Sequence, residues 1–492
     1  MSTLALLLVV VYGLCLILVF CYSLIQLHLT FLYYRCANKK KDFPDFPLYL
    51  PNTLPFVTVQ LPVYNEQYVV ERLIDAITAL DYPLEKLQIQ VLDDSNDITR
   101  DLVAAKVAFY QAQGFDITQV LRPERTGYKA GALEYGLNLA TGEFIAIFDA
   151  DFLPAPSFLK QTLIKFKNPE VGLVQTRWGH VNSNYSLLTK LQAFGLNAHF
   201  TVEQTGRSCG HYFINFNGTG GVWRKTCILD AGGWQTDTLT EDLDLSYRAQ
   251  LRHWEFRYLE PIIAPAELPV TMPAIKSQQY RWTKGAAENA RKNLGPVFQS
   301  NKPWSTKIHA LFHLGNSSVF VCVFLLALLS VPILFIPDYY PHLQAYFLSQ
   351  ELFLISLASL IAFYWTSFRC SSPNQAASWL QFCPRFFWFL CFSMGLSLHN
   401  TVAVLEGYAG KKTPFIRTPK FNIQKASDPW RNNLYRTASI NFLMLLEGIL
   451  ALYFLAGILF GFYLQRYGLL PFHSMLTLGF GGVFFLTVKH SR

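Results

Sequence analysis

Long stretches without charged residues divide the chain into apolar and ordinary regions. The stretches without Asp, Glu, Lys or Arg cover residues 1–34, 308–337, 352–368, 386–405 and 467–488, and residues 437–465 hold only Glu447. Each is close to, or longer than, the ~20 apolar residues that an α-helix needs to cross the hydrocarbon core of a bilayer. The pattern predicts a soluble domain between membrane anchors, with Glu447 facing away from lipid.

Between residues 56 and 176, apolar strands alternate with helical patterns. The expected strands are FVTVQLP (56–62), LQIQVLDDS (87–95), VLR (120–122), FIAIFDAD (144–151) and VGLVQT (171–176). The first four are followed by expected helices over 66–80 and 97–113, from about 129 and from about 156. This alternation predicts a parallel sheet with helices on both faces, and ligands of such sheets bind beyond the carboxyl ends of the strands.

Basic residues set the expected membrane topology. The segment 409–436 carries seven Lys and Arg residues, and basic loops stay in the cytoplasm. If all six apolar stretches crossed the membrane, this loop would lie outside. We therefore expect the polar-interrupted stretch around 386–405 to form an amphipathic helix in the membrane interface.

The resulting division has six parts. They are an N-terminal anchor at 1–34, a cytosolic domain at 51–300, two spans within 305–370, an interfacial amphipathic helix at 376–408, a cytosolic loop at 409–436 and two spans within 437–488.

Charge and cysteine content narrow the classes of partner. The net charge of +8 comes largely from basic clusters beside the apolar stretches, including Lys39–Lys41. Such clusters favour contact with anionic lipid over nucleic acid. The nine cysteines include no CxxC pair, so the sequence predicts no disulfide framework.

Carboxylates follow three of the expected strands. Tyr64–Asn65–Glu66 follows the first, Asp93–Asp94 the second, and Asp149 with Asp151 the fourth. Each group alone is equally well explained by a turn or a helix cap, but three acidic strand ends on one rim favour a ligand site. Residues two apart in an extended chain point the same way, so Asp149 and Asp151 repel each other unless a cation lies between them.

A nucleotide sugar is the ligand that this rim suggests. Magnesium is commonly held by one or two carboxylates together with substrate phosphates, which suits Asp149 and Asp151. Either Asp93 or Asp94 would then hold the base and ribose, and the pattern does not separate the two. The chain has no GxxxxGK[ST] loop, so it lacks the main sequence feature that would indicate an ATPase.

Three motifs in the second half of the domain complete a recognisable set. They are FNGTGGVWR (216–224), TEDLDLS (240–246) and QQYRW (278–282). The acidic TED cluster alone would be explained as stabilising a helix N-terminus. Together with LPVYNE, LDDS, YKAGAL and DAD, in this order over about 56–285, the motifs resemble the processive family-2 glycosyltransferases. These include cellulose synthase catalytic subunits, hyaluronan synthases and the plant cellulose-synthase-like mannan and glucan synthases, and the last group is the most similar.

The resemblance implies a fold and a set of site residues. The fold is an α/β cytosolic glycosyltransferase domain, GT-A-like with a Rossmann-type mixed sheet, joined to an α-helical transmembrane region. Asp149 and Asp151 would hold Mg²⁺ or Mn²⁺, and Asp242, beside Glu241, would be the general base. The implied substrate-binding residues are Asp93, Asp94, Lys129, Asp149, Gly218, Thr219, Gln278, Arg281, Trp282, Phe415, Thr418 and Lys420.

The last three of these belong to FIRTPK in the basic loop. It resembles the gating loop F-x-V-T-x-K of bacterial cellulose synthases, with Arg417 where valine is usual.

The expected function is processive, inverting polymerisation of a nucleotide-diphosphate sugar, UDP-glucose or GDP-mannose. The product would be a β-linked glucan or mannan, with β-1,4 linkages expected, translocated across the plasma or inner membrane from a cytoplasmic catalytic domain. The alternative is a non-processive membrane glycosyltransferase with a lipid acceptor. Expected partners are the sugar donor, the growing β-glycan and membrane lipid. No nucleic acid is expected. The sequence leaves open whether the protein forms a homo-oligomer.

Overall fold

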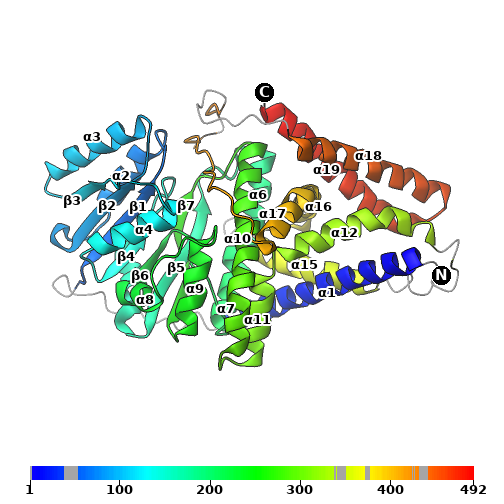
Figure 1. Ribbon diagram of the computed structural model, residues 1–492, viewed down its shortest axis with the longest axis horizontal. Coiled ribbons are helices and arrows are strands. Elements are labelled where there is room, and N and C mark those ends of the chain that lie inside the picture. The colour runs from blue at the N-terminus through cyan, green and yellow to red at the C-terminus, as the bar shows by residue number, and fades with distance from the viewer. Residues whose placement is uncertain are drawn as a thin grey trace.

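A sheet domain and a set of long apolar helices lie at opposite ends of the molecule, with a long helix between them (Figure 1). This computed structural model describes residues 3–37, 54–336, 340, 351–371, 377–423, 425, 427–430 and 441–491. The basic cluster at 39–41 and positions 431–436 of the predicted basic loop lie outside the described residues.

One seven-stranded sheet forms the centre of the domain. Its strands are β1 (Val57–Val63), β2 (Leu87–Asp93), β3 (Asp116–Val120), β4 (Phe144–Ile147), β5 (Val171–His180), β6 (Gly221–Arg224) and β7 (Glu255–Ala266), in the order β3-β2-β1-β4-β6-β5-β7. All neighbours are parallel except β6, which is antiparallel to β4 and β5. The mixed sheet implied by the family resemblance is confirmed, because the strands expected within residues 56–176 all run in one direction and β6, which lies outside that range, runs in the other.

Two cores cover the two faces of this sheet. Phe144 and Ala146 lie in one core, and Ile145 and Ile147 lie in the other. Successive residues of a strand point to opposite faces, so a strand buried on both sides is a continuous apolar run. The third strand lies at 116–120 rather than at the predicted 120–122; its residues alternate in exposure and give a weaker apolar signal.

Helices join and cover the strands. In the first half they are α2 (Val70–Thr78), α3 (Thr99–Gln111), α4 (Tyr128–Leu139) and α5 (Phe158–Leu163), with short 3₁₀ turns η3 (Leu84–Lys86) and η4 (Ile164–Lys167). In the second half they are α6 (Leu187–Ala198), the π-helical turn η5 (His199–Glu203), α7 (Gln204–Cys209), α8 (Lys225–Asp230), α9 (Glu241–Leu251) and α10 (Met272–Gln299).

The apolar helices follow the predicted stretches. They are α1 (Thr3–Ala37), α11 (Trp304–Leu314), α12 (Ser318–Ile333), α15 (Glu351–Cys370), α16 (Trp379–Gly395), α17 (Ser397–Tyr408), α18 (Phe442–Tyr463) and α19 (Leu470–Ser491), the last preceded by the short turn η7 (Tyr467–Leu469). Among the described residues, three helices are long and apolar enough to cross a membrane, or up to five if each bent pair is one span.

The segment predicted as one interfacial helix, 376–408, consists of two helices. α16 and α17 meet at a bend of 49°. α16 packs against α19, with Gly395 so close to Gly479 that a Cβ would lie 2.3 Å from the Gly479 carbonyl oxygen. α17 packs against α10 and α12. The position of this pair relative to a membrane stays a prediction.

Two long-range links join the apolar helices to the domain. Glu447 on α18 is fully buried, and its carboxylate lies 2.6 Å from the Lys276 ammonium on α10; the expectation that it faces a channel rather than lipid stays a prediction. Cys36 at the end of α1 forms a disulfide with Cys209 on α7. The expectation of no disulfide is wrong for this pair, which depends on α1 packing against α7.

The bent pair and the basic loop lead to a topological prediction. A cysteine that replaces the exposed Lys412, in a background in which the exposed Cys383 is serine, should react with an impermeant maleimide only from the cytoplasmic side. A cysteine at Tyr467, in the turn between α18 and α19, is the matched control and should react only from outside. Labelling of both from the same side would contradict five crossings.

Candidate active site

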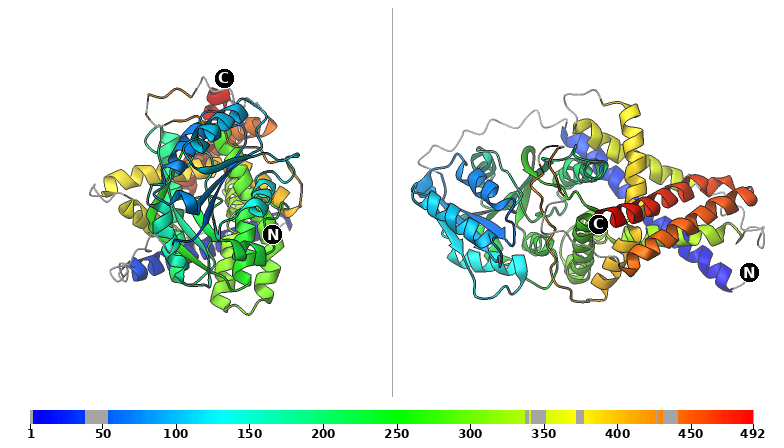
Figure 2. Two further views of the ribbon diagram at one scale, coloured as in Figure 1. Left: turned by 90° about the vertical axis from the view of Figure 1, so that its left-hand side faces the viewer. Right: turned by 90° about the horizontal axis from the view of Figure 1, so that it is seen from above.

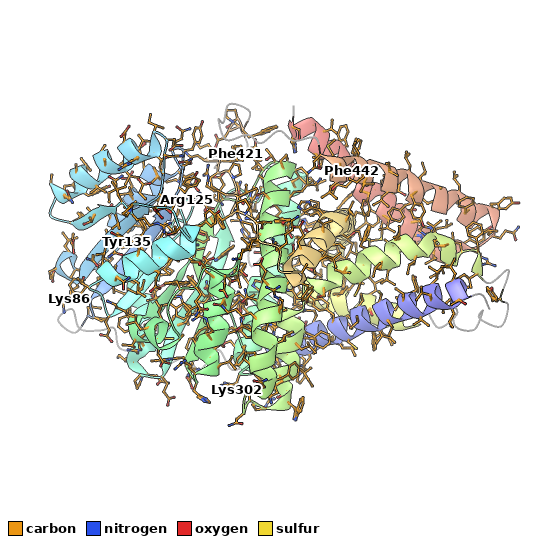
Figure 3. The ribbon with its side chains drawn as sticks, viewed as in Figure 1. Lys86, Arg125, Tyr135, Lys302, Phe421 and Phe442 are labelled. Carbon is orange, nitrogen blue, oxygen red and sulfur yellow. A yellow bond between two sulfur atoms is a disulfide. The ribbon has the colours of Figure 1, made fainter. Side chains whose placement is uncertain are left out.

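A cavity lies where the carboxyl ends of β1, β2 and β4 face α9, α10 and a segment of the basic loop. Thirteen predicted residues line it: Asp94, Lys129, Asp149, Asp151, Gly218, Glu241, Asp242, Gln278, Arg281, Trp282, Phe415, Thr418 and Lys420. Asp93 and Thr219 do not. Arg125, which also lines the cavity, and Phe421 of the basic loop both lie on the side of α10 that faces the sheet (Figure 3).

The two carboxylates of the DAD motif are each paired with a lysine. Asp149 lies 2.5 Å from the Lys129 ammonium, and Asp151 lies 2.7 Å from the Lys420 ammonium. Asp151 also accepts a hydrogen bond from the backbone N–H of Glu267. Cations therefore balance the two charges that the sequence places side by side.

Thr219 supports this arrangement without reaching the cavity. Its hydroxyl accepts a hydrogen bond from the backbone N–H of Asp149 at 2.9 Å. Thr219 is fully buried, so in this structure its hydroxyl holds the strand end, and a contact with substrate stays a prediction.

The structure separates Asp93 from Asp94. Asp94 lines the cavity and accepts two hydrogen bonds from the Arg122 guanidinium, at 2.7 and 2.6 Å. Asp93 is buried and accepts from the Ser95 backbone N–H and the Gln119 amide. The side chains of neighbouring residues in an extended chain point to opposite sides. Asp94 therefore faces the cavity, and Asp93 faces the interior of the domain.

Glu241 and Asp242 are the first two residues of α9, and both line the cavity. Burial and the negative charge of the adjacent Glu241 together raise the pKa of Asp242 to about 8, although Lys129 opposes the shift. The Lys129 ammonium also donates to the Gly218 carbonyl at 2.9 Å. The raised pKa of the Asp242 carboxyl group suits a proton acceptor near neutral pH.

Gly218 brings the FNGTGG loop close to these groups. Its φ of +79° is one that L-residues rarely adopt, and a Cβ there would lie 3.1 Å from Asp242 Oδ2. A side chain at this position would fill the space next to the carboxylate, so glycine keeps that space open.

The Q-x-x-R-W residues lie on one face of α10, because residues three and four apart on a helix are neighbours. Gln278, Arg281 and Trp282 all line the cavity. The Trp282 ring lies 6.5 Å from that of Trp178, a residue at the end of β5 that sequence reasoning missed. Its predicted strand ends at 176, so the pattern carried no signal for Trp178.

Residues 411–423, here called the cover loop, lie against the cavity. Arg281 donates to the Thr418 hydroxyl at 2.7 Å and to the Ile416 carbonyl, and its guanidinium lies 4.7 Å from the centre of the Phe415 ring. The predicted loop residues Phe415, Thr418 and Lys420 therefore meet the strand-end carboxylates and α10 in one place.

Two further charged residues at this cavity were missed as site residues. Arg417 lies 2.6 Å from the Glu66 carboxylate, and the Arg125 guanidinium lies 3.4 Å from the centre of the Tyr64 ring. Glu66 and Tyr64 belong to the LPVYNE motif, which was the available signal. Their partners come from elsewhere in the chain and could not be paired by pattern.

Comparison with known proteins identifies the family of this chain. The family model "Glycosyltransferase like family 2" matches residues 55–285. Glucomannan 4-beta-mannosyltransferase 1 of Oryza sativa subsp. japonica is 35% identical, covering 79% of this chain and 73% of that protein. Glucomannan 4-beta-mannosyltransferase 2 of Arabidopsis thaliana is 36% identical, covering 75% and 68%.

A solved structure shares the fold. The mannosyltransferase PcManGT from Pyrobaculum calidifontis, in complex with GDP-Man and Mn²⁺, superimposes with a TM-score of 0.55 at 20% identity, over 82% of this chain and all of that one. With the motif order, the cavity and the two plant relatives, the chain belongs to the family-2 glycosyltransferases of the cellulose-synthase-like type and is a glycosyltransferase enzyme.

Proposed function

We propose that this enzyme is processive and inverting, and that it polymerises a nucleotide-diphosphate sugar into a β-1,4-linked glycan that leaves through the apolar helices. The observation that carries the proposal is the single cavity that joins the DAD carboxylates, Asp242 and the Q-x-x-R-W face of α10. The relatives named as glucomannan 4-β-mannosyltransferases support a mannosyl donor, GDP-mannose, over UDP-glucose.

Asp149 and Asp151 are the proposed ligands of a Mg²⁺ or Mn²⁺ ion. No cluster of three or more His, Cys, Asp or Glu suited to a metal occurs in the described part of the chain. Two carboxylates completed by donor phosphates fit the way magnesium is usually bound in such sites. When bound, the ion would balance the charge of the leaving diphosphate.

Asp242 is the proposed general base. The acceptor hydroxyl attacks the anomeric carbon of the donor, its proton passes to the Asp242 carboxylate, and the bond to the nucleotide diphosphate breaks. One such displacement inverts the configuration, so an α-linked donor yields a β-linked product. Arg281, Lys129 and Lys420 line the same cavity and present fixed positive charge to the departing diphosphate.

The acceptor chain would meet α10 next. Trp282 and Trp178 offer neighbouring aromatic rings at the cavity wall. α17 packs along α10, and Lys276 near the start of α10 pairs with Glu447 of α18. This continuity from the cavity to the apolar helices supports export coupled to synthesis.

The product identifies the activity. Purified full-length protein in nanodiscs with Mn²⁺ should convert radiolabelled GDP-mannose into a polymer that endo-β-1,4-mannanase digests, and UDP-glucose should be a poorer donor. A single sugar recovered on lipid would overturn processivity, and polymer formed only from UDP-glucose would overturn the mannosyl donor.

Replacing either DAD carboxylate should abolish transfer. We expect Asp149→Ala and Asp151→Ala to lower kcat by at least ~10², the size of loss seen when one group that stabilises transition-state charge is removed. EDTA should have the same effect and excess Mn²⁺ should reverse it. Asp101→Ala, at an exposed position on α3, is the control. Full activity in EDTA would exclude the metal.

Asp242→Asn should separate catalysis from binding. The amide is nearly isosteric but accepts no proton, so kcat should fall by ~10²–10⁴ while the affinity for GDP changes little. The base works deprotonated, and its pKa is raised to about 8. In the wild type, kcat/KM should therefore increase as the pH is raised through about 8, where Asp242 loses its proton, and decrease as the pH is lowered through it. Retained activity in Asp242→Asn, with loss in Glu241→Gln, would make Glu241 the base.

A further inference from the structure

The cover loop is held at both of its ends by contacts outside the cavity. At the first end, the Lys284 ammonium donates to the Lys411 carbonyl at 2.5 Å and to the Thr413 hydroxyl at 2.7 Å. At the other end, Phe421 and Ile423 are buried against Val270. Figures 1 and 2 show the loop as a thin ribbon passing between the sheet domain and α10.

The middle of the loop is extended and stiffened by its sequence. Pro414 and Pro419 bracket four residues, and a proline fixes its own φ and favours extended backbone in the residue before it. In such a segment, consecutive side chains point in opposite directions. Arg417 accordingly points to Glu66 beyond β1, while Thr418 meets Arg281 on α10.

The Arg417–Glu66 pair is withdrawn from water. Only 14% of the Arg417 side chain and 9% of the Glu66 side chain are exposed, and the two charges lie 2.6 Å apart. Glu66 is fixed in place because its backbone carbonyl accepts hydrogen bonds from the N–H groups of Val69 and Val70 at the start of α2. Burial raises the pKa of Glu66 to about 7, although Arg417 and Lys420 oppose the shift.

Similar contacts continue along the loop. Three residues after Arg417, Lys420 pairs with Asp151, and Glu267 accepts a hydrogen bond from the Phe421 backbone N–H at 2.8 Å. The Arg72 guanidinium donates to the Asn422 side chain at 2.6 Å. Arg417 thus makes the ion pair nearest the middle of the loop, and it lies between Ile416 and Thr418, both of which Arg281 contacts.

We propose that the Arg417–Glu66 ion pair is the clasp that sets the register of the cover loop, and that Arg417 is a positioning residue for the transfer reaction. A loop shifted by one residue would direct Thr418 away from Arg281 and Lys420 away from Asp151. The valine usual at this position in the bacterial gating-loop pattern has no charge to offer Glu66. The clasp therefore distinguishes this chain from that pattern.

The clasp acts on donor binding more than on bond formation. The ion pair holds the middle of the loop against the cavity that would take the donor. Loss of the pair leaves the loop tethered at its ends but free to shift in the middle. This part of the inference rests on the proposed function, because it concerns the KM of a sugar donor.

A double-mutant cycle tests the clasp in the full-length enzyme in nanodiscs. Arg417→Ala and Glu66→Gln should each raise the KM for the nucleotide sugar by ~10-fold, with a smaller change in kcat, because a tenfold change in affinity corresponds to loss of one modest charged contact. The double variant should be no worse than either single variant, since both remove the same interaction.

Charge exchange gives the sharper result. Arg417→Glu alone should raise KM further, and combining it with Glu66→Arg should recover most of the loss. Lys412→Glu makes the same charge change at an exposed position of the same loop and should behave as the wild type. Equal effects of Arg417→Glu and Lys412→Glu would show that the net charge of the loop, not the clasp, is what counts.

Hydrogen exchange of the peptide 413–420 supplies a readout that needs no donor. Without ligand, this peptide should exchange faster in Arg417→Ala and Glu66→Gln than in the wild type and in Lys412→Glu. Equal exchange rates, or additive effects in the cycle, overturn the clasp. If the wild type transfers no sugar but the exchange rates differ as expected, the clasp stands and the proposed function fails.

Discussion

The buried negative charge at the ends of the strands is the constraint on which the rest of this structure depends. Asp149, Asp151, Glu66 and Glu267 all line one cavity together with Asp242. Several carboxylates in one partly dry space repel one another strongly unless cations or metal ions lie among them. Much of the fold around the cavity can be understood as the means of bringing cations to this place.

Those cations come from distant parts of the chain. Lys129 arrives on α4, Arg281 on α10, and Arg417 and Lys420 on the cover loop. α4 and α10 are held by buried apolar side chains, whereas the cover loop is held by hydrogen bonds from Lys284 at its first end and by the burial of Phe421 and Ile423 at the other. Under the proposed function, a donor that brings its own diphosphate and metal ion would change this balance of charge around the cover loop.

α10 connects this charge balance to the apolar helices. One helix carries the cavity face of Gln278, Arg281 and Trp282, the Lys284 contact that holds the start of the cover loop, and the Lys276 ion pair to Glu447. α17 lies so close to it that a Cβ on Gly407 would lie 2.7 Å from the Lys284 carbonyl. α10 therefore contacts both the cavity and the apolar helices, so a shift of α10 at the cavity would move its contacts with those helices.

The sequence by itself determined most of the elements in the first half of the domain and the candidate residues of the site. Apolar runs of the right length predicted four of the first five strands and the long helices, because these patterns reflect local burial. The strand-end carboxylates could be grouped because the carboxyl ends of parallel strands meet at a common edge, whereas TED and Q-x-x-R-W, which belong to helices α9 and α10, joined them only through the resemblance to the family-2 glycosyltransferases.

Only the tertiary structure decided how these residues are paired. The direction of β6, the choice of Asp94 over Asp93, the Cys36–Cys209 link and the bend between α16 and α17 each depend on packing between segments far apart in the chain. The same holds for Arg417 and Glu66, which are separated by most of the protein. Local pattern shows which side chains are charged, whereas the partner of a buried charge is set by the fold that removes both from water.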